Sequence, residues 1–312
     1  MRAELSPIPG STSVTFVSWR PWGSRSSRFR GKKQGKGTKE QRGKGKVRFS
    51  PRSLCPLLLS SVLSGGQMSR ILSTCWLLLL AAGLCSSAAA QAAQKPVYEA
   101  LKTGAAIQVD GRLDEPVWSV VPAVGPFRQN ANGQSSELET EARITYDDEF
   151  VYFAFRCSDP NVWSTRGKRD MHLWEEEVVE AFIQGSPAHP SYIELEVNPL
   201  GAMLDIYLLD IRKPIPYESW NSSRLKWAVQ VDGTVDGNPG DKGWTCEIAL
   251  PIEDVVTAPN RPPKPGDRWR LNLYRGDSKP ARAGLAWSPT MRPDFHVPSM
   301  FGELVFTGRM AK

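Results

Sequence analysis

The chain has 312 residues, with 39 Lys and Arg against 33 Asp and Glu and a formal net charge of +6. The basic residues are concentrated at the start: residues 1–67 contain 14 Lys and Arg and 2 Asp and Glu, whereas residues 91–312 contain 24 and 31. The larger part therefore carries a charge near −7, which removes the electrostatic case for nucleic-acid binding there.

Residues 1–67 are rich in Gly, Ser, Lys and Arg and show neither the helical nor the strand period of apolar residues. Because such a segment cannot bury enough apolar surface to fold, we expect it to be disordered. Two interpretations remain open: a basic nucleic-acid-binding arm, or sequence upstream of the true start. The segment that follows favours the second, since a signal peptide works from the N-terminus.

Residues 68–90 have the pattern of a secretory signal peptide. A basic start at Met68–Arg70 precedes an apolar stretch over 71–84 that is too short for a membrane span, and Ser87–Ala90 supply the small side chains that cleavage requires. We expect the mature protein to begin near Gln91, to be secreted or periplasmic, and to keep no membrane segment after cleavage.

Residues 91–312 are expected to form one domain, built almost entirely of β-strands. A strand over 105–109 and a turn at Asp110-Gly111 lead into a short helix near Pro116. The other strands are predicted over 142–146, 150–157, 178–183, 192–197, 203–208, 225–231, 244–250, 268–274, 285–287 and 303–306. Short strands separated by Pro and Gly, several with alternating apolar residues, predict an all-β, two-sheet antiparallel sandwich of jelly-roll-like form.

Cysteine and histidine indicate no structural zinc. Cys157 and Cys246 fall on predicted strands; in an exported protein they can form a disulfide or stay as buried free thiols, and both remain open. The histidines His172, His189 and His296 are scattered and have no cysteine partners at zinc spacing.

The stretch Trp174–Ile183 places an aromatic ring and four carboxylates at the start of an apolar strand. A pyranose offers C–H faces that an indole covers and hydroxyls that carboxylates bind, which favours sugar binding. The alternative is an edge strand with solvated charges. Hydrolysis would need two carboxyl groups facing each other about 5–10 Å apart, and the sequence identifies no opposed acid, so we expect a binding protein rather than an enzyme.

Four segments, 109–118, 174–183, 243–251 and 287–306, resemble in order and spacing the family 9 carbohydrate-binding modules. The resemblance runs from about Ala105 to Phe306. It implies non-catalytic carbohydrate binding that supports polysaccharide capture and catabolism, with a glycan as ligand and separate glycoside hydrolases as partners. We expect the protein to be a monomer.

The resemblance also implies a stacking site. Members of the family that bind sugars clamp the ring between two tryptophans; Trp174 lies where the first is expected, and Phe295 stands in place of the second. Glu180 matches an acid that hydrogen-bonds sugar hydroxyls. The phenyl ring of Phe295 is smaller than an indole, so it can still stack on a sugar ring but covers less of its surface.

Further ligand-binding candidates depart from the family pattern. Glu196 stands where sugar-binding members carry an arginine, so specificity for reducing-end sugars does not transfer. Asn198 offers a hydrogen bond, and Arg275 can restore a cation. His296, beside the second clamp position, and Trp220, in a polar loop, complete the predicted set.

The family often holds structural calcium through loop carboxylates and carbonyls. The resemblance implies Asp147, Asp148 or Asp277 as ligands, although loops of Asp also occur simply as turns. No other cofactor is expected.

Two other classes of function remain open. Sandwiches similar to this one hold haem in electron-transfer proteins, and Met171-His172, or His296 with Met300, are the candidate axial ligands. The second alternative is a glycoside hydrolase that uses Glu180. The sequence does not identify the sugar or the polymer.

Overall fold

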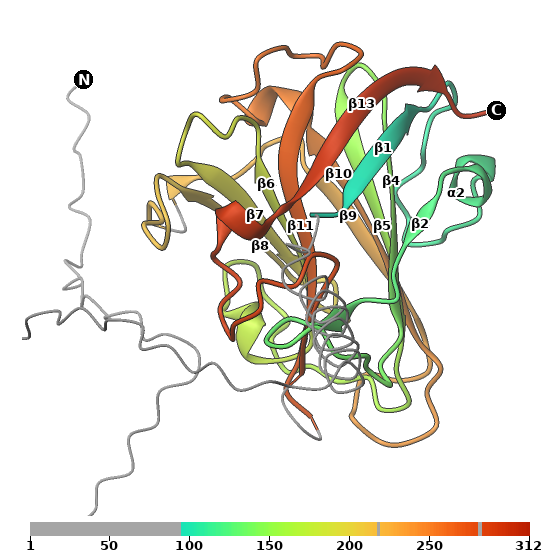
Figure 1. Cartoon of the computed structure of the whole chain (residues 1–312). Helices are drawn as coiled ribbons and strands as arrows, with labels where there is room; N and C mark the ends of the chain where they lie inside the picture. Colours follow the sequence, from blue (N-terminus) through green and yellow to red (C-terminus); the bar gives the residue numbers. More distant parts are fainter. Residues whose placement is uncertain (1–94, 217–218, 280–282) are drawn as a thin grey trace, which may run out of the picture. The chain divides into compact units, whose positions relative to one another are not determined.

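The computed structural model describes residues 95–216, 219–279 and 283–312; the expected disordered segment 1–67 and signal peptide 68–90 lie outside the described residues. The described part is a thirteen-stranded β-structure with little helix (Figure 1). Its strands are β1 (Val97–Lys102), β2 (Ala123–Val124), β3 (Arg128–Gln129), β4 (Thr140–Tyr146), β5 (Phe150–Ser158), β6 (Val178–Gln184), β7 (Tyr192–Val197), β8 (Met203–Leu208), β9 (Lys226–Asp232), β10 (Gly243–Pro251), β11 (Arg268–Asp277), β12 (Ala283–Ala286) and β13 (Gly302–Met310). Short helical segments are α2 (Pro116–Val120), η2 (Leu173–Glu175), η4 (Ile252–Asp254) and η5 (Pro298–Met300).

The strands are hydrogen-bonded in the order β8-β7-β6-β11-β13-β1-β4-β5-β10-β9. Side chains from both halves of this order share one buried core: Ala181 and Leu195 belong to the same cluster as Phe153 and Ile248. The sheet therefore folds over into two layers, joined through β13 and β1, which lie side by side in Figure 1. This confirms the predicted all-β sandwich.

Strand alternation explains the core. In β5 and β10 the residues at every second position point between the layers, since side chains of a strand alternate between its two faces. β6 is buried on both faces: Val179, Ala181 and Ile183 join the inter-layer core, while Val178 and Phe182 join a second apolar cluster on the opposite face. The second cluster adjoins the candidate site.

The start of the domain differs from the prediction. Residues 105–109 form no strand; instead β1 pairs parallel with both β13 and β4, whereas the other ladders among the described strands are antiparallel. The Glu247 carboxylate accepts hydrogen bonds from the backbone N–H groups of Asp110 and Gly111, which ties this segment across β10. Gly111 has φ +84° and approaches the Val229 backbone so closely that a Cβ would clash at 2.6 Å.

Trp118, Trp244 and Trp269 are buried, whereas Trp227 on β9 is half-buried. Cys157 and Cys246 are free and buried in the core, and burial raises the pKa of the Cys157 thiol to about 12. The sequence left open whether these cysteines form a disulfide, and the structure shows that they do not.

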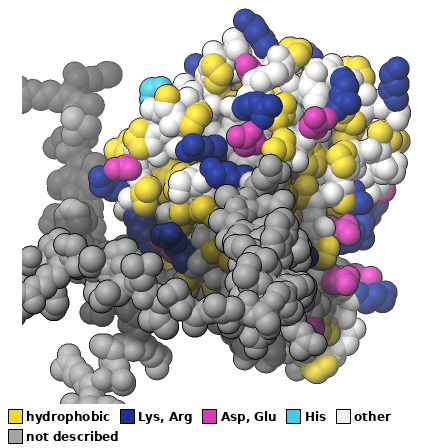
Figure 2. Space-filling model, viewed as in Figure 1, with side chains coloured by type: hydrophobic (Ala, Val, Ile, Leu, Met, Phe, Trp, Pro, Cys, Tyr) yellow, Lys and Arg dark blue, Asp and Glu magenta, His cyan; other side chains and the backbone are white. Residues whose placement is uncertain are grey.

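In the space-filling view, the visible described surface intersperses Lys and Arg with Asp, Glu and apolar side chains (Figure 2). Among the described residues, none of the helices has the length and hydrophobicity needed to cross a bilayer.

Candidate functional site

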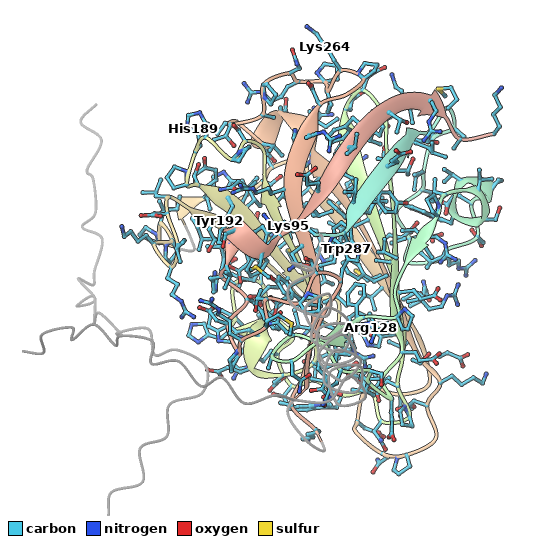
Figure 3. All side chains as sticks on the ribbon, viewed as in Figure 1. Lys95, Arg128, His189, Tyr192, Lys264 and Trp287 are labelled. Atoms are coloured by element: carbon cyan, nitrogen blue, oxygen red, sulfur yellow. The ribbon has the colours of Figure 1, made fainter. Side chains whose placement is uncertain are left out.

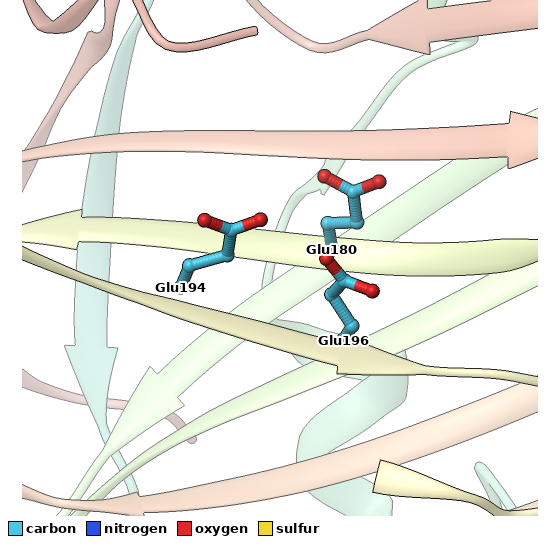
Figure 4. A group of neighbouring side chains, drawn as sticks. All are labelled: Glu180, Glu194 and Glu196. Atoms are coloured by element: carbon cyan, nitrogen blue, oxygen red, sulfur yellow. The ribbon is translucent and has the colours of Figure 1, made fainter. Parts of the chain in front are cut away.

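Three glutamates project from one face of the neighbouring strands β6 and β7. Glu180 lies opposite Glu196 in the ladder, and Glu194 lies two residues before Glu196 on the same face. One carboxylate oxygen from each lies within 4.8 Å of the other two (Figure 4). Their exposed fractions are only 2%, 5% and 0% for Glu180, Glu194 and Glu196. We call this arrangement the acid face.

The charge of the acid face is poorly compensated. Neither carboxylate oxygen of Glu196 accepts a hydrogen bond from a described residue. Among the described residues, one side chain that can carry a positive charge lies within ion-pair distance of these three glutamates. It is His296, whose Nδ1 lies 4.0 Å from a Glu194 carboxylate oxygen. Two unit charges about 5 Å apart repel by ~3 kcal/mol at an effective dielectric constant of about 20. The three carboxylates therefore need protons or a cation.

The pKa values reflect this environment. Burial, and then neighbouring carboxylates, raise the pKa of Glu180 and Glu196 well above the usual range. The backbone N–H of Trp174 opposes the shift of Glu196 without reaching hydrogen-bond geometry. Burial also raises the pKa of Glu194 to about 7. The acid face can thus hold protons at neutral pH when no cation is bound.

His296 lies beside the acid face as a neutral ring. Its Nδ1 is 2.7 Å from the hydroxyl of Tyr192, which is labelled at β7 in Figure 3. Burial, and then the charge of Arg212, lower the pKa of His296 to about 4. With its pKa this low, His296 is uncharged at neutral pH and adds no positive charge to the acid face. This arrangement gives no support to His296 as a haem ligand.

Trp174 and Phe295 border the same face but differ in exposure. Both pack with the apolar cluster around Phe182. Trp174, in η2, is half-buried and stacks on His172, with ring centroids 4.3 Å apart. Phe295 is 6% exposed, and its ring stacks on Tyr274 at 4.1 Å. The Phe295 ring is thus part of the packing in this structure, and Trp174 is the ring that reaches the surface.

Three other predicted ligand residues are not presented on the acid face for binding. Asn198 is buried, and its side-chain amide is fully hydrogen-bonded within the protein. Its Nδ2 donates to Ser164 Oγ and to the Arg166 carbonyl in the loop before η2, and its Oδ1 accepts from Ala202 N–H. Its observed role is to hold that loop.

Trp220 packs against Tyr207, with ring centroids 5.7 Å apart, and both rings adjoin the core between the layers. Tyr207 lies opposite Ile193 on β7, a residue of that core. Trp220 therefore lies on the other side of β7 and β8 from the acid face.

Arg275 is fully buried on the inner face of β11, opposite Val179 in the ladder. It forms ion pairs with Asp159 and with Glu177, the latter at 3.1 Å, and donates to the Ser158 carbonyl. Because Tyr274 and Arg275 alternate, only Tyr274 faces the acids. We call Arg275, Asp159 and Glu177 the inner ion cluster.

The aspartates predicted to hold calcium do not converge. Asp147 accepts hydrogen bonds within the β4–β5 turn, from Glu149 and Phe150 N–H groups, and Asp148 pairs with Lys102 at 2.6 Å. Asp277 lies at the end of β11, where it accepts from Trp163 Nε1 and Lys279 N–H. Asp147 precedes β5, and the inner ion cluster near Asp277 lies at its other end. Nine residues of strand span about 30 Å, so the two carboxylates cannot share an ion.

Glu194 was not predicted as a site residue. The signal was present in the alternation of Glu194, Leu195 and Glu196, which puts both acids on the face opposite Leu195.

A family model described as carbohydrate-binding family 9 matches residues 131–306, more than half of the chain. A protein of Arthroderma benhamiae named "Extracellular protein" is 26% identical over 202 residues, covering 60% of this chain and 82% of that protein.

Solved structures have a similar fold. A Bacteroides uniformis protein, provisionally named as carbohydrate-binding, superposes with a TM-score of 0.55 at 18% identity, over 68% of this chain and 98% of that one. A family 9 module of Caldicellulosiruptor kristjanssonii, solved with cellotriose, gives 0.48 at 15% identity, over 68% and 94%. On the strength of the family match, this chain belongs to carbohydrate-binding family 9.

Proposed function

We propose that the domain binds carbohydrate without catalysis, at the acid face, with Trp174 as the stacking ring. The observation that carries the proposal is the family match over 131–306, which contains all the strands and loops of this face. The chemistry agrees with it, since Glu196 has two carboxylate oxygens that lack donors, and sugar hydroxyls are donors.

A binding role fits the acids better than hydrolysis. Glu180, Glu194 and Glu196 project from adjacent strands on one face, with ligand atoms within 4.8 Å. Glycoside hydrolysis uses two carboxyl groups that flank the scissile bond, about 5–10 Å apart. The acid face presents a group of acceptors on one side of a ligand rather than an opposed pair.

The rim of the acid face makes the first contact in this proposal. Trp174 and its stacked neighbour His172 lie at the surface, whereas the acids lie beneath. An indole face covers the C–H face of a pyranose. The carboxylates of the acid face are then the acceptors for the sugar hydroxyls.

We also infer that the protein is exported, with 68–90 as its signal peptide, and acts as a secreted or periplasmic monomer. Its role would be to hold polysaccharide for separate glycoside hydrolases and so to support polysaccharide catabolism. The relative named "Extracellular protein" supports export.

A glycan array of the purified protein tests the proposal. We compare wild type with Trp174→Ala and with Trp220→Ala, a matched control because Trp220 is also half-buried but lies on the other side of β7 and β8. Wild type and Trp220→Ala should bind the same glycans, and Trp174→Ala should bind about tenfold more weakly, as expected for losing one stacked ring. A blank array for wild type, or equal binding by Trp174→Ala, would overturn it.

A further inference from the structure

The acid face contains a group of carboxylate oxygens whose close spacing is not explained by the proposed carbohydrate binding. Glu180, Glu194 and Glu196, drawn in Figure 4, each have one carboxylate oxygen that lies within 4.8 Å of those of the other two. They come from two neighbouring strands, so the backbone ladder fixes their spacing. Three carboxylates in an apolar setting are rare unless something compensates their charge.

A second observation points to a ligand. Glu196 is 0% exposed, and both of its oxygens lack a hydrogen-bond partner among the described residues. Buried carboxylate oxygens in proteins nearly always have partners. Here Glu196 faces Glu180 and Glu194, whose carboxylates can satisfy its oxygens only by carrying a proton.

Among the described residues, the side chains around the acid face supply little positive charge. Arg212 forms an ion pair with Asp294, and its charge lowers the pKa of Glu194 only in part. His296 contacts the Tyr192 hydroxyl and stays neutral at neutral pH. The other neighbours on this face, such as Phe182 and Tyr274, are aromatic.

We propose that Glu180, Glu194 and Glu196 together bind one hard divalent cation, and that calcium fits them best. Carboxylate oxygens are the ligands that calcium prefers, and the set contains no nitrogen or sulfur donor that would favour zinc or copper. Two oxygens on opposite sides of a calcium ion, each about 2.4 Å from it, are about 4.8 Å apart. The oxygens of the acid face can therefore surround the ion with little movement.

The bound cation joins β6 to β7 and replaces the missing donors of Glu196. Calcium takes about 6–8 oxygen ligands, so three carboxylates leave positions for water. Sugar hydroxyls can take the same positions; this one step rests on the proposed carbohydrate function. The metal site itself stands whether or not a sugar binds.

Calorimetric titration of calcium chloride into the metal-free full-length protein tests the site. We expect one ion per chain in wild type and a rise in the midpoint of thermal unfolding with calcium. Glu196→Gln should bind at least tenfold more weakly and lose that rise. Glu253→Gln is the matched control, since Glu253 is exposed and pairs with Arg224 in another part of the chain, and it should behave as wild type.

The outcomes are decisive in each direction. Absence of heat and of any thermal shift in wild type at 10 mM calcium, about tenfold above the dissociation constants of the weakest protein calcium sites, would overturn the proposal. So would wild-type affinity in Glu196→Gln, or tighter binding of magnesium than of calcium. If Glu196→Gln does not fold, Glu194→Gln replaces it with the same expectations.

A glycan array with calcium and with a chelator separates this inference from the proposed function. Calcium binding with a blank array leaves the metal site and removes carbohydrate binding. Glycan binding that the chelator does not change removes the step in which hydroxyls coordinate the ion.

Discussion

Two groups of buried carboxylates lie on opposite faces of the same layer of strands, and they differ in their partners. In the inner ion cluster, Glu177 receives hydrogen bonds from Trp244 Nε1 and Trp163 N–H and pairs with Arg275. The two terminal nitrogens of Arg275 have acceptors, whereas its Nε has none among the described residues. On the acid face, Glu196 receives no hydrogen bond from any described residue.

The difference separates a structural group from the group that we propose to bind a ligand. A buried charge is stable when it is paired and hydrogen-bonded, and costly otherwise. The inner ion cluster meets most of this requirement through its own ion pairs and hydrogen bonds, although burial still raises the pKa of Glu177 to about 8. The acid face does not meet it within the described residues, which is why we assign ligand binding there.

The largest expected effect comes from breaking the inner ion cluster. Arg275→Met leaves Asp159 and Glu177 buried without their cation, and we expect a loss of about 3–5 kcal/mol in the free energy of unfolding. Urea unfolding followed by tryptophan fluorescence measures it. Arg309→Met, which removes an exposed pair with Glu99, is the control and should cost less than about 1 kcal/mol. Similar costs for both variants would show that the inner ion cluster is not structural.

The next effect tests whether His296 compensates the acid face. Its folded pKa of about 4 lies below the ordinary histidine value of 6.5. The folded state then binds fewer protons than the unfolded state between these values, so the contribution of His296 to stability is present above pH 6.5 and is lost as pH falls through 4. The shift corresponds to about 3 kcal/mol.

Urea unfolding between pH 4 and pH 7, for wild type and His296→Gln, measures that contribution. The carboxylates with raised pKa make the free energy of unfolding fall as pH rises, and they do so in both proteins. Subtracting the value for His296→Gln from that for wild type removes their effect. The remaining difference should grow with pH. If His296 instead carries a charge paired with Glu194, the difference will shrink as pH rises. That result would make the acid face resemble the inner ion cluster.

A smaller effect, of opposite sign, is expected at Glu196. In the presence of a chelator at pH 7.5, Glu196→Gln removes a buried group that lacks donors and should raise the free energy of unfolding by about 1–2 kcal/mol. Glu253→Gln, in an exposed position, should change it by less than about 0.5 kcal/mol. A destabilisation by Glu196→Gln without metal would mean that Glu196 already has its partners within the protein.

The smallest effect is expected at the rim. Trp174 is half-buried, so Trp174→Ala should cost about 1 kcal/mol of stability, whereas Trp244→Ala in the core should cost about 3–5 kcal/mol. Thermal and urea unfolding of the two variants compare them. A cost at Trp174 equal to that at Trp244 would assign Trp174 to the packing instead of to binding.

The sequence predicted most of the sandwich, because strands with one apolar face show a period of two. β4, β5, β10 and the strands of the acid face follow from that pattern. The pattern predicts a strand at 105–109 and none at β1, whereas the structure has β1 and no strand at 105–109. Both are short and apolar, and what separates them is tertiary: the Glu247 carboxylate holds Asp110 and Gly111 outside the ladder.

The acid face could be predicted only in part. Glu180 and Glu196 were identified, but the face to which Arg275 points could not be read, because β11 is buried on both sides and both of its alternating sets are largely apolar. Phe295 lies in a loop, where no period indicates whether a ring covers a sugar or fills the core.

A crystal structure of the protein grown with calcium tests the central claim most directly, through the anomalous difference map. The account predicts one peak on the acid face, about 2.4 Å from an oxygen of each of Glu180, Glu194 and Glu196. A map without a peak there, or with a peak only near Asp147, Asp148 or Asp277, would contradict it.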